Sequence, residues 1–313
     1  MDLIEDIRKK VRLTEHTVQN VTSTDFPNTY EGYNDAWSHE KFEETFQVDI
    51  VSLSGYLMEF DMVGIDAAIA NAIRRILIAE VPTMAIDSVH IFNNTSVVQD
   101  EVLAHRLGLL PIKADPRLFE YKQKVHSRDL EWIPLPGQEH LKSKGIRPVE
   151  DDILITLLRP GHELDIDMFC VKGIGKDHAK FSPVATASFR LLPEISLLQE
   201  FHGEQAERLQ KSFSPGVIEL VQKPDGTKVA KVTNARADTC SRNVFRYEDL
   251  KEGVSLARCR DHFIFSVEST GILPPDVLVS ESIKILMGKC QKFLQELEDT
   301  SSHLAKQKKG KKL

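Results

Sequence analysis

Two stretches of the chain carry helical apolar patterns wider than a helix needs to pack on its own domain. The first is GIDAAIANAIRRILIAEVPTMAI, residues 64–86, with Asp66 as a suitable N-cap and Pro82 as a stop. At 100° per residue its apolar arc covers roughly 200°, about twice the usual stripe. The arc contains Ile65, Ile69, Ile73, Ile76 and Leu77 with Ala68, Ala70, Ala72 and Ala79, and Asn71, Arg74 and Arg75 form the polar strip.

A second helix is predicted to begin at Pro274-Pro275 and to run about 23 residues, or about 34 Å. Its apolar residues follow the 4-3 spacing of a coiled-coil seam, at Val279, Ile283, Leu286, Cys290, Phe293 and Leu297. Ile285, Met287 and Leu294 add apolar surface outside that seam. Excess apolar surface on two helices favours an obligate interface with another chain. Full burial of the first helix inside one large core is the alternative.

Most other elements are predicted to be strands, because apolar and polar residues alternate along them. FQVDIV and YLMEFDMV form a hairpin around Leu53-Ser54-Gly55, with Met58, Phe60 and Met62 inward and Glu59 and Asp61 toward water. A second hairpin is expected over 152–171. Further strands are expected in AIDSVHIFNNTSV, FSPVATASFRLL, GVIELVQ, KVAKVTN and SLARCRDHFIFSVEST, the last with Phe263, Phe265 and Val267 on one face.

A short amphipathic helix is expected in QDEVLAHRLGLLPI, with Gly108 just beyond its end and Pro111 preventing continuation. Another short helix is expected near residues 3–10, within an otherwise aperiodic N-terminal segment. Antiparallel strands with few helices and no repeated β-α alternation predict an α+β fold.

The charge of the chain argues against a nucleic-acid-binding fold. The formal net charge is −7, and the five lysines of KQKKGKK (306–312) leave about −12 on the remaining body. Such a body repels phosphate backbones, and the lysine tail is expected to be disordered. No apolar run reaches the roughly 18 residues that span a bilayer. The four cysteines lie far apart, which predicts reduced thiols in a cytosolic or nuclear protein rather than a disulfide framework.

No motif predicts catalysis. KGIGKDHAKF (172–181) combines glycines, lysines and a histidine, yet it fits neither common phosphate-loop pattern and is interpreted as a loop that presents basic side chains to a partner. His105, His162, His178 and His262 are solitary, without the spacing of a metal pair. Asp165 and Asp167 share one side of a strand, where a solvated face is the simpler interpretation than a cation site. No catalytic, cofactor or metal residue is predicted.

Four ordered blocks resemble the alpha family of RNA polymerase subunits. They are residues 66–86, NNTSVVQDEVLAHRLGLLPI (93–112), KGIGKDHAKFSPVA (172–185) and FIFSVESTGILPPDVLVSESI (263–283). Within the family, they are most similar to the larger alpha-like subunit shared by eukaryotic RNA polymerases I and III. The polymerase II paralogue usually carries a cysteine zinc cluster in its inserted domain, whereas this chain has no cysteine before Cys170.

The resemblance implies a non-catalytic assembly platform in the nucleus, including the nucleolus, that supports rRNA, 5S rRNA and tRNA transcription. Such a subunit forms a heterodimer with a smaller alpha-like subunit, and the dimer docks the largest and second-largest subunits, with little direct nucleic-acid contact. The implied partner interface is Ile65, Ile69, Ile73, Ile76, Leu77, Val279, Ile283, Leu286, Cys290, Phe293 and Leu297. The implied large-subunit contacts are Arg74, Arg75, Lys172 and Lys176.

The resemblance also implies a domain arrangement. A dimerisation domain, an antiparallel sheet with two long helices, is expected over 45–86 and 181–300, interrupted by a mainly-β inserted domain over 87–180. An N-terminal extension (1–44) and a basic tail (301–313) flank it, and the stretch from Tyr121 to Trp132 is shorter than in the family. The alternatives are a polymerase II-type subunit without the zinc site, an enzyme that binds a phosphorylated ligand through 172–181, and a homodimeric scaffold paired through Val279 to Leu297.

Overall fold

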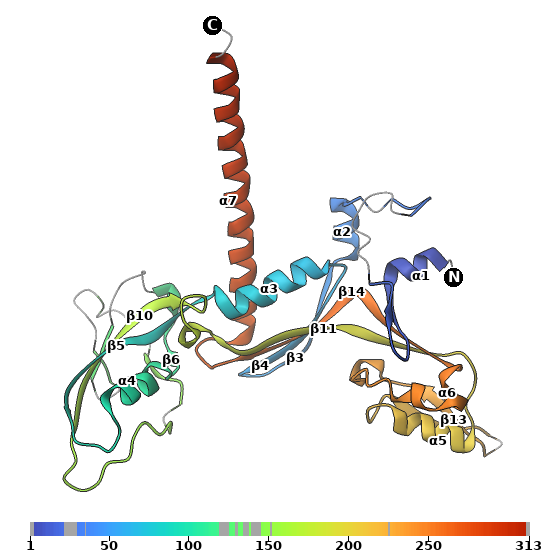
Figure 1. The fold of residues 1–313 in the computed structure, drawn as a ribbon, viewed down its shortest axis with the longest axis horizontal. Coiled ribbons are helices and arrows are strands. Elements are labelled where there is room, and N and C mark those ends of the chain that lie inside the picture. Colours follow the sequence, from blue (N-terminus) through green and yellow to red (C-terminus); the bar gives the residue numbers. More distant parts are fainter. Residues whose placement is uncertain are drawn as a thin grey trace. The chain divides into compact units, whose positions relative to one another are not determined.

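The computed structural model describes residues 3–21, 30–34, 36–118, 125–128, 131–133, 138, 145–150, 152–224 and 226–310 (Figure 1). Antiparallel strands and helices build an α+β structure, as the apolar periodicity predicts. The chain forms two compact units, each assembled from segments far apart in the sequence. The first unit comprises Met1–Asp49, Phe60–Ala70 and Phe189–Phe265, and the second comprises Ile50–Glu59, Asn71–Ser188 and Ser266–Leu313.

The helices and 3-10 turns are α1 (Leu3–Lys9), α2 (His39–Thr45), α3 (Ala67–Ala79), α4 (Asp100–Gly108), η1 (Pro116–Leu118), η3 (Ala179–Phe181), α5 (Gly203–Ser212), η4 (Ala235–Ala237), η5 (Asn243–Arg246), α6 (Glu248–Lys251) and α7 (Pro275–Gly310). The strands are β1 (Lys10–Leu13), β2 (Val18–Gln19), β3 (Gln47–Leu53), β4 (Leu57–Val63), β5 (Pro82–Asn94), β6 (Ile112–Lys113), β7 (Val125–Arg128), β8 (Glu131–Ile133), β9 (Arg147–Pro148), β10 (Leu164–Ile174), β11 (Val184–Leu197), β12 (Ile218–Gln222), β13 (Lys228–Val232) and β14 (Val254–Ser269).

The largest sheet has the strand order β2-β1-β14-β4-β3, and β11 also pairs with β14. The predicted β3–β4 hairpin is confirmed, and the Ser54 N–H donates to the Leu57 carbonyl across its turn at 2.8 Å. The residues expected to face the core are buried: Met58, Phe60 and Met62 on β4, and Phe263, Phe265 and Val267 on β14. The Phe60 and Phe265 rings stack with their centroids 5.0 Å apart, which fixes β4 against β14.

Asp61 of β4 is an exception to the predicted alternation. It was expected to face water, but only 7% of it is exposed. The Arg236 guanidinium donates to both carboxylate oxygens, at 2.6 and 2.5 Å, and His262 Nε2 lies 2.9 Å from Oδ2. The expectation is wrong because alternation along a strand cannot reveal ion partners that come from residues distant in the sequence.

Strand β1 and helix α5 of the first unit are among the elements that the sequence pattern does not predict. Within the expected N-terminal extension, β1 pairs with β14 in the register Leu13↔Leu256. Helix α5 buries Ala206 and Leu209 in the same apolar cluster that contains Leu13. The N-terminal segment therefore contributes to the core of the first unit.

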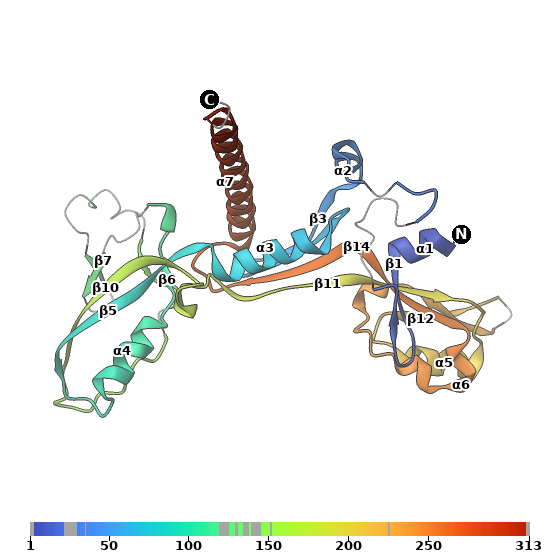
Figure 2. The ribbon, with the colours of Figure 1, turned by 45° about the horizontal axis from the view of Figure 1, so that its top comes forward.

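The second unit contains a four-stranded sheet of order β5-β10-β7-β8. Strands β5 and β10 pair along nearly their full length, from Leu164↔Asn94 to Ile174↔Pro82 (Figure 2). Helix α4 packs on β5 and buries Leu103 and Leu107 completely. The sequence pattern predicts β5, α4 and β10 correctly in this unit.

The hairpin predicted over 152–171 is wrong in its first half. Residues 152–159 have no regular secondary structure, and only β10 forms a strand. Strand β10 pairs with β5 along its whole length on one edge and with β7 only over Asp167–Cys170 on the other, and no strand from residues 152–159 joins it. An apolar run beside a turn therefore does not suffice to predict a hairpin.

Two predicted helix ends also differ from the structure. Gly108 is the last residue of α4 rather than the residue beyond it, because the Leu109 N–H bonds the Arg106 carbonyl in a tightened last turn. Helix α7 has 36 residues and continues to Gly310, so most of the tail expected to be disordered is helical. Residues 298–309 contain neither proline nor glycine, and leucine, alanine, lysine and glutamine favour the helix.

The expected boundaries of the inserted domain at 87 and 180 stay a prediction, since the two compact units divide the chain differently. The stretch predicted to be shortened, from Tyr121 to Trp132, lies partly outside the described residues. Its described part forms β7 and the first two residues of β8, which pair with each other in the register Ser127↔Trp132.

Candidate partner-docking surface

Helix α3 begins at the predicted cap. The Asp66 carboxylate accepts the Ala68 N–H at 2.7 Å, which satisfies one of the free donors of the first turn. Ile73 and Leu77 face the interior and are 2% and 0% exposed, whereas Ile69 and Ile78 are 39% and 36% exposed. The wide apolar arc is thus divided, with one side used inside the chain and part of the other left in water.

The residues predicted to meet a partner differ in exposure: five are buried, one is half-buried and five are exposed. Five of them are buried within this chain: Ile65, Ile73, Ile76, Leu77 and Val279. Leu286 is half-buried. Ile69, Ile283, Cys290, Phe293 and Leu297 are exposed. The exposed group is open to solvent, whereas the buried group packs inside this chain.

Helix α7 carries a row of exposed apolar side chains, which we call the α7 strip. It consists of Ile283, Met287, Cys290, Phe293, Leu294 and Leu297. Positions 283, 287, 290, 294 and 297 alternate steps of four and three, so they share one side of the helix. Phe293 and Leu294 are each about 60% exposed (61% and 60%), which is unusual for large apolar residues so close together. Met287 and Leu294 lie outside the predicted seam but belong to this surface.

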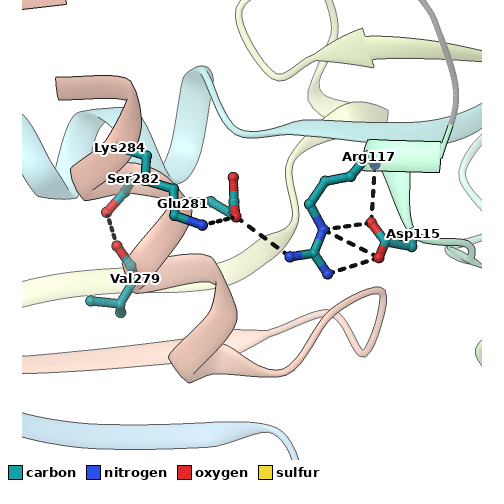
Figure 3. Close-up of polar contacts among 6 residues, drawn as sticks. All are labelled: Asp115, Arg117, Val279, Glu281, Ser282 and Lys284. Carbon is teal, nitrogen blue, oxygen red and sulfur yellow. Dashed lines mark hydrogen bonds and ion pairs between the residues drawn. The ribbon is translucent and has the colours of Figure 1, made fainter. Parts of the chain in front are cut away.

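The first turns of α7 are fixed to the rest of the second unit. Leu278 and Ser282 are fully buried, and the Ser282 hydroxyl donates to the Val279 carbonyl at 2.7 Å (Figure 3). Arg117, in η1, donates to the Asp115 carboxylate, and its Nη1 lies 3.6 Å from Glu281 Oε1 on α7 (Figure 3). The Ser282–Val279 bond is internal to α7, whereas the burial of Leu278 and Ser282 and the contact from Arg117 anchor the base of the helix, and the α7 strip begins directly beyond them.

The four basic residues implied in large-subunit contacts have different environments. Arg74 donates from Nε and Nη2 to the Asn71 side-chain oxygen, at 3.1 and 2.9 Å, and is half-buried. Arg75 is exposed on the outer side of α3. Lys172 is half-buried on β10, and Lys176 is exposed in the loop that follows β10. Arg75 and Lys176 are therefore the most accessible of the set.

Contacts within the chain explain the glycines and lysines of the KGIGKDHAKF segment (172–181) without a bound phosphate. Gly175 lies against the backbone of Ile78, and the Lys176 N–H donates to the Ala79 carbonyl at 2.8 Å. The segment thus meets the C-terminal end of α3, whose partial negative charge repels a phosphate. Lys180, which would be a phosphate ligand, is already paired with Asp87 at 2.8 Å.

The histidines and aspartates do not assemble into a metal centre. Among the residues that the structure describes, no group of three His, Cys, Asp or Glu side chains is placed to hold a metal ion. Asp165 is exposed and Asp167 half-buried on the same side of β10, as predicted from their alternation.

All four cysteines are free thiols, and the surroundings of two of them disfavour the thiolate. Burial raises the pKa of Cys170 to about 12. Burial, followed by the nearby Glu194 carboxylate, raises the pKa of Cys259 to about 11. Both therefore stay protonated at neutral pH and are poor nucleophiles.

In the described part of the chain, no helix is both long and apolar enough to cross a bilayer.

Comparison with known proteins identifies the class to which this arrangement belongs. The RNA polymerase Rpb3/Rpb11 dimerisation domain family matches residues 59–290, and the chain belongs to this family. It is 57% identical to the DNA-directed RNA polymerases I and III subunit RPAC1 of Homo sapiens, over 94% of this chain and 97% of that protein. The resemblance inferred from the four sequence blocks is confirmed.

Two further relatives place the chain within the family. The RPAC1 subunit of Saccharomyces cerevisiae is 41% identical over 90% of this chain and 96% of its own length. The RNA polymerase II subunit rpb3 of Dictyostelium discoideum is 30% identical over 78% of this chain and 92% of its own length. The alignment with the human protein spans 336 positions, more than the 313 residues of this chain, so that relative carries at least 23 residues (336 minus 313) without a counterpart here.

Proposed function

We propose that the chain is a non-catalytic assembly subunit of the DNA-directed RNA polymerases I and III. It acts in the nucleus, including the nucleolus. It forms a heterodimer with a smaller alpha-like subunit, and the dimer then docks the two large subunits for transcription of rRNA, 5S rRNA and tRNA. Membership of a family defined by its dimerisation domain supports the first step. The relatives shared by polymerases I and III support the choice of enzyme.

The observation that carries the proposal is the α7 strip. A soluble protein rarely leaves a contiguous row of large apolar side chains in water, and burying such a row contributes strongly to association. The row has the spacing at which a second helix packs side by side. A partner helix that covers it accounts for the apolar excess that the chain's own core does not use.

The contacts with the large subunits are proposed for the basic residues. Arg75 is the best placed, since it is exposed on the same helix whose apolar face meets the partner. A guanidinium offers a fixed fork of donors that suits carboxylates and carbonyls of another protein. Lys176 adds a second exposed cation, while Arg74 and Lys172 have less free surface.

Co-expression with the smaller alpha-like subunit tests the proposal. We expect a stable 1:1 complex, and Phe293→Asp should abolish it by placing an unpaired charge in the interface. Leu198→Asp is the matched control, because Leu198 is similarly exposed (67%) but lies on the first unit outside the α7 strip. A stable monomer that ignores the partner, or equal effects of the two substitutions, contradicts the proposal.

Three other functions have less support. A polymerase II-type subunit is distinguished by affinity purification, which identifies the large subunits that accompany the chain. A phosphate-binding enzyme requires micromolar nucleotide affinity that Lys176→Ala removes, and the pairing of Lys180 with Asp87 disfavours it. A homodimeric scaffold requires the isolated chain to self-associate through the α7 strip. Because the body is acidic, little direct contact with nucleic acid is expected.

A further inference from the structure

The segment 173–181, which includes most of the KGIGKDHAKF motif, touches the last turn of α3 through its backbone. A Cβ atom added to Gly175 would lie 2.2 Å from the Ile78 carbonyl oxygen and 3.2 Å from the Ala79 Cα. Both neighbours are backbone atoms, so no side-chain rotation relieves the overlap. Any larger residue at 175 must therefore move either the loop or the end of α3.

The next residue adds a hydrogen bond at the same place. The Lys176 N–H donates to the carbonyl of Ala79, the last residue of α3, at 2.8 Å. Carbonyls in the last turn of a helix have no partner within the helix, so this bond satisfies one that would otherwise face water. The close approach at Gly175 and the bond from Lys176 hold the same end of the helix.

The far end of the segment is tied to β5, the strand that follows α3. Lys180 Nζ donates to the Ile86 carbonyl at 2.9 Å and pairs with Asp87 at 2.8 Å, and only 12% of its side chain is exposed. The Thr83 hydroxyl donates to the Phe181 carbonyl at 2.7 Å. The segment thus joins the end of α3 to β5, which is held in the sheet by its pairing with β10.

The end of α3 in turn contacts α7. Glu80, directly after α3, pairs with Lys289 of α7, with Oε1 and Nζ 2.5 Å apart. Lys289 lies between Met287 and Cys290, two members of the α7 strip. The end of α3 and α7 are therefore linked by a direct ion pair, on a turn of α7 that also carries members of the α7 strip.

We infer that segment 173–181 is a clamp that positions the last turn of α3 relative to α7, and that Gly175 is its positioning residue. The clamp acts on the docking surface without touching the partner. The inference rests on the proposed function, because it concerns the surface through which the chain is proposed to bind the smaller alpha-like subunit. Gly175 is then required by backbone packing, and Gly173 lies against the Phe181 ring, where an added Cβ would come within 2.7 Å, so neither glycine needs a bound phosphate to explain it.

The test compares full-length variants for affinity to the smaller alpha-like subunit and for hydrogen exchange at the Glu80 and Val81 amides. Gly175→Ala should weaken binding about tenfold, or about 1.4 kcal/mol, and speed exchange at these amides. Gly55→Ala is the matched control, since nothing lies within 4 Å of a Cβ added there. Lys180→Met, which keeps the stem but removes the ion pair, should weaken binding in the same direction by a smaller factor.

Leu209→Ala separates a general loss of stability from a specific effect of the clamp on binding. This substitution opens a cavity in the core of the first unit and leaves the clamp intact. Equal affinity losses in Leu209→Ala and Gly175→Ala would overturn the inference. So would unchanged affinity and unchanged exchange in Gly175→Ala. If the unmodified chain does not bind the partner, the proposed function fails, and faster exchange at Glu80 and Val81 in Gly175→Ala still supports the clamp.

Discussion

Lys289 of α7 pairs with Glu80 at the end of α3, with Nζ and Oε1 2.5 Å apart. The pair directly joins the two helices whose apolar excess predicts a partner. The two side chains are 51% and 28% exposed, so water and salt screen their attraction. The pair therefore links the two helices but contributes little to the stability of the fold.

Replacing Lys289 with methionine should change the free energy of unfolding by less than about 1 kcal/mol, as for other exposed ion pairs. Chemical denaturation at low and high salt measures it, and the small difference between variant and parent should shrink further at high salt. A loss of more than about 2 kcal/mol would show that the pair is structurally essential rather than a surface contact.

Aspartate substitutions at Ile73 and Phe293 should separate folding from binding. Ile73 is 2% exposed, so Ile73→Asp buries an unpaired charge and should destabilise the fold by about 4 kcal/mol or more. Phe293 is 61% exposed, so Phe293→Asp should leave the unfolding midpoint of the isolated chain nearly unchanged while heterodimer formation is lost. Thermal unfolding and co-purification measure the two effects. A Phe293→Asp variant that unfolds like Ile73→Asp would contradict the exposure of the α7 strip.

Leu286 is the intermediate case, because it is half-buried. Leu286→Asp should impair both the stability of the chain and its heterodimer, each less than the more extreme substitution does. The unfolding midpoint and heterodimer formation of Leu286→Asp should both fall between those of Ile73→Asp and Phe293→Asp. Measuring all three variants together tests whether burial within this chain decides which of the two properties is lost.

The sequence predicts those elements whose pattern is local. The β3–β4 hairpin, α3 with its Asp66 cap and the inward face of β14 follow from spacing over a few residues. The misses depend on distant partners. Asp61 is buried because Arg236 and His262 reach it, and residues 152–159 form no strand although their apolar run lies beside a turn.

The docking surface could be predicted only in part for a related reason. Periodicity shows that Ile69 and Ile73 belong to one wide apolar arc, but it cannot show which of them the chain covers itself. That division depends on which side of α3 the rest of the folded chain covers, and periodicity does not reveal this. The role of Gly175 was also hidden, because its requirement arises from the backbone of Ile78, which is far from it in the sequence.

The buried carboxylate of Asp61 should make stability depend on acid pH. Burial alone would raise the pKa of Asp61, but hydrogen bonds and charge from Arg236 and His262 outweigh it and lower the pKa below the ordinary 3.8. A carboxyl whose pKa is lower in the folded state contributes stability that is fully present above its unfolded pKa. The contribution is lost as the pH falls through the folded value. Denaturant unfolding between about pH 6 and about pH 3 should show this loss.

Asp61→Asn is the corresponding variant. It leaves the Arg236 guanidinium, 23% exposed, without its carboxylate and should cost about 3 kcal/mol at neutral pH. The gap between variant and parent should narrow as the pH falls below about 4, because the Asp61 carboxyl of the unfolded parent then takes up a proton while that of the folded parent is still ionised. A constant gap across that range would show that Asp61 is not the group responsible.

Alkylation of Cys290 should report partner binding directly. Cys290 is exposed on the α7 strip, whereas Cys170 is buried with its pKa raised to about 12. A small alkylating reagent near neutral pH should therefore modify Cys290 first and leave Cys170 unmodified until the chain unfolds. Saturation with the smaller alpha-like subunit should slow the labelling of Cys290 at least about tenfold, because the proposed interface excludes the reagent. Mass spectrometry of the peptides measures the rate, and Phe293→Asp should restore it in the presence of partner. Unchanged labelling of Cys290 in the saturated complex would mean that the partner binds elsewhere.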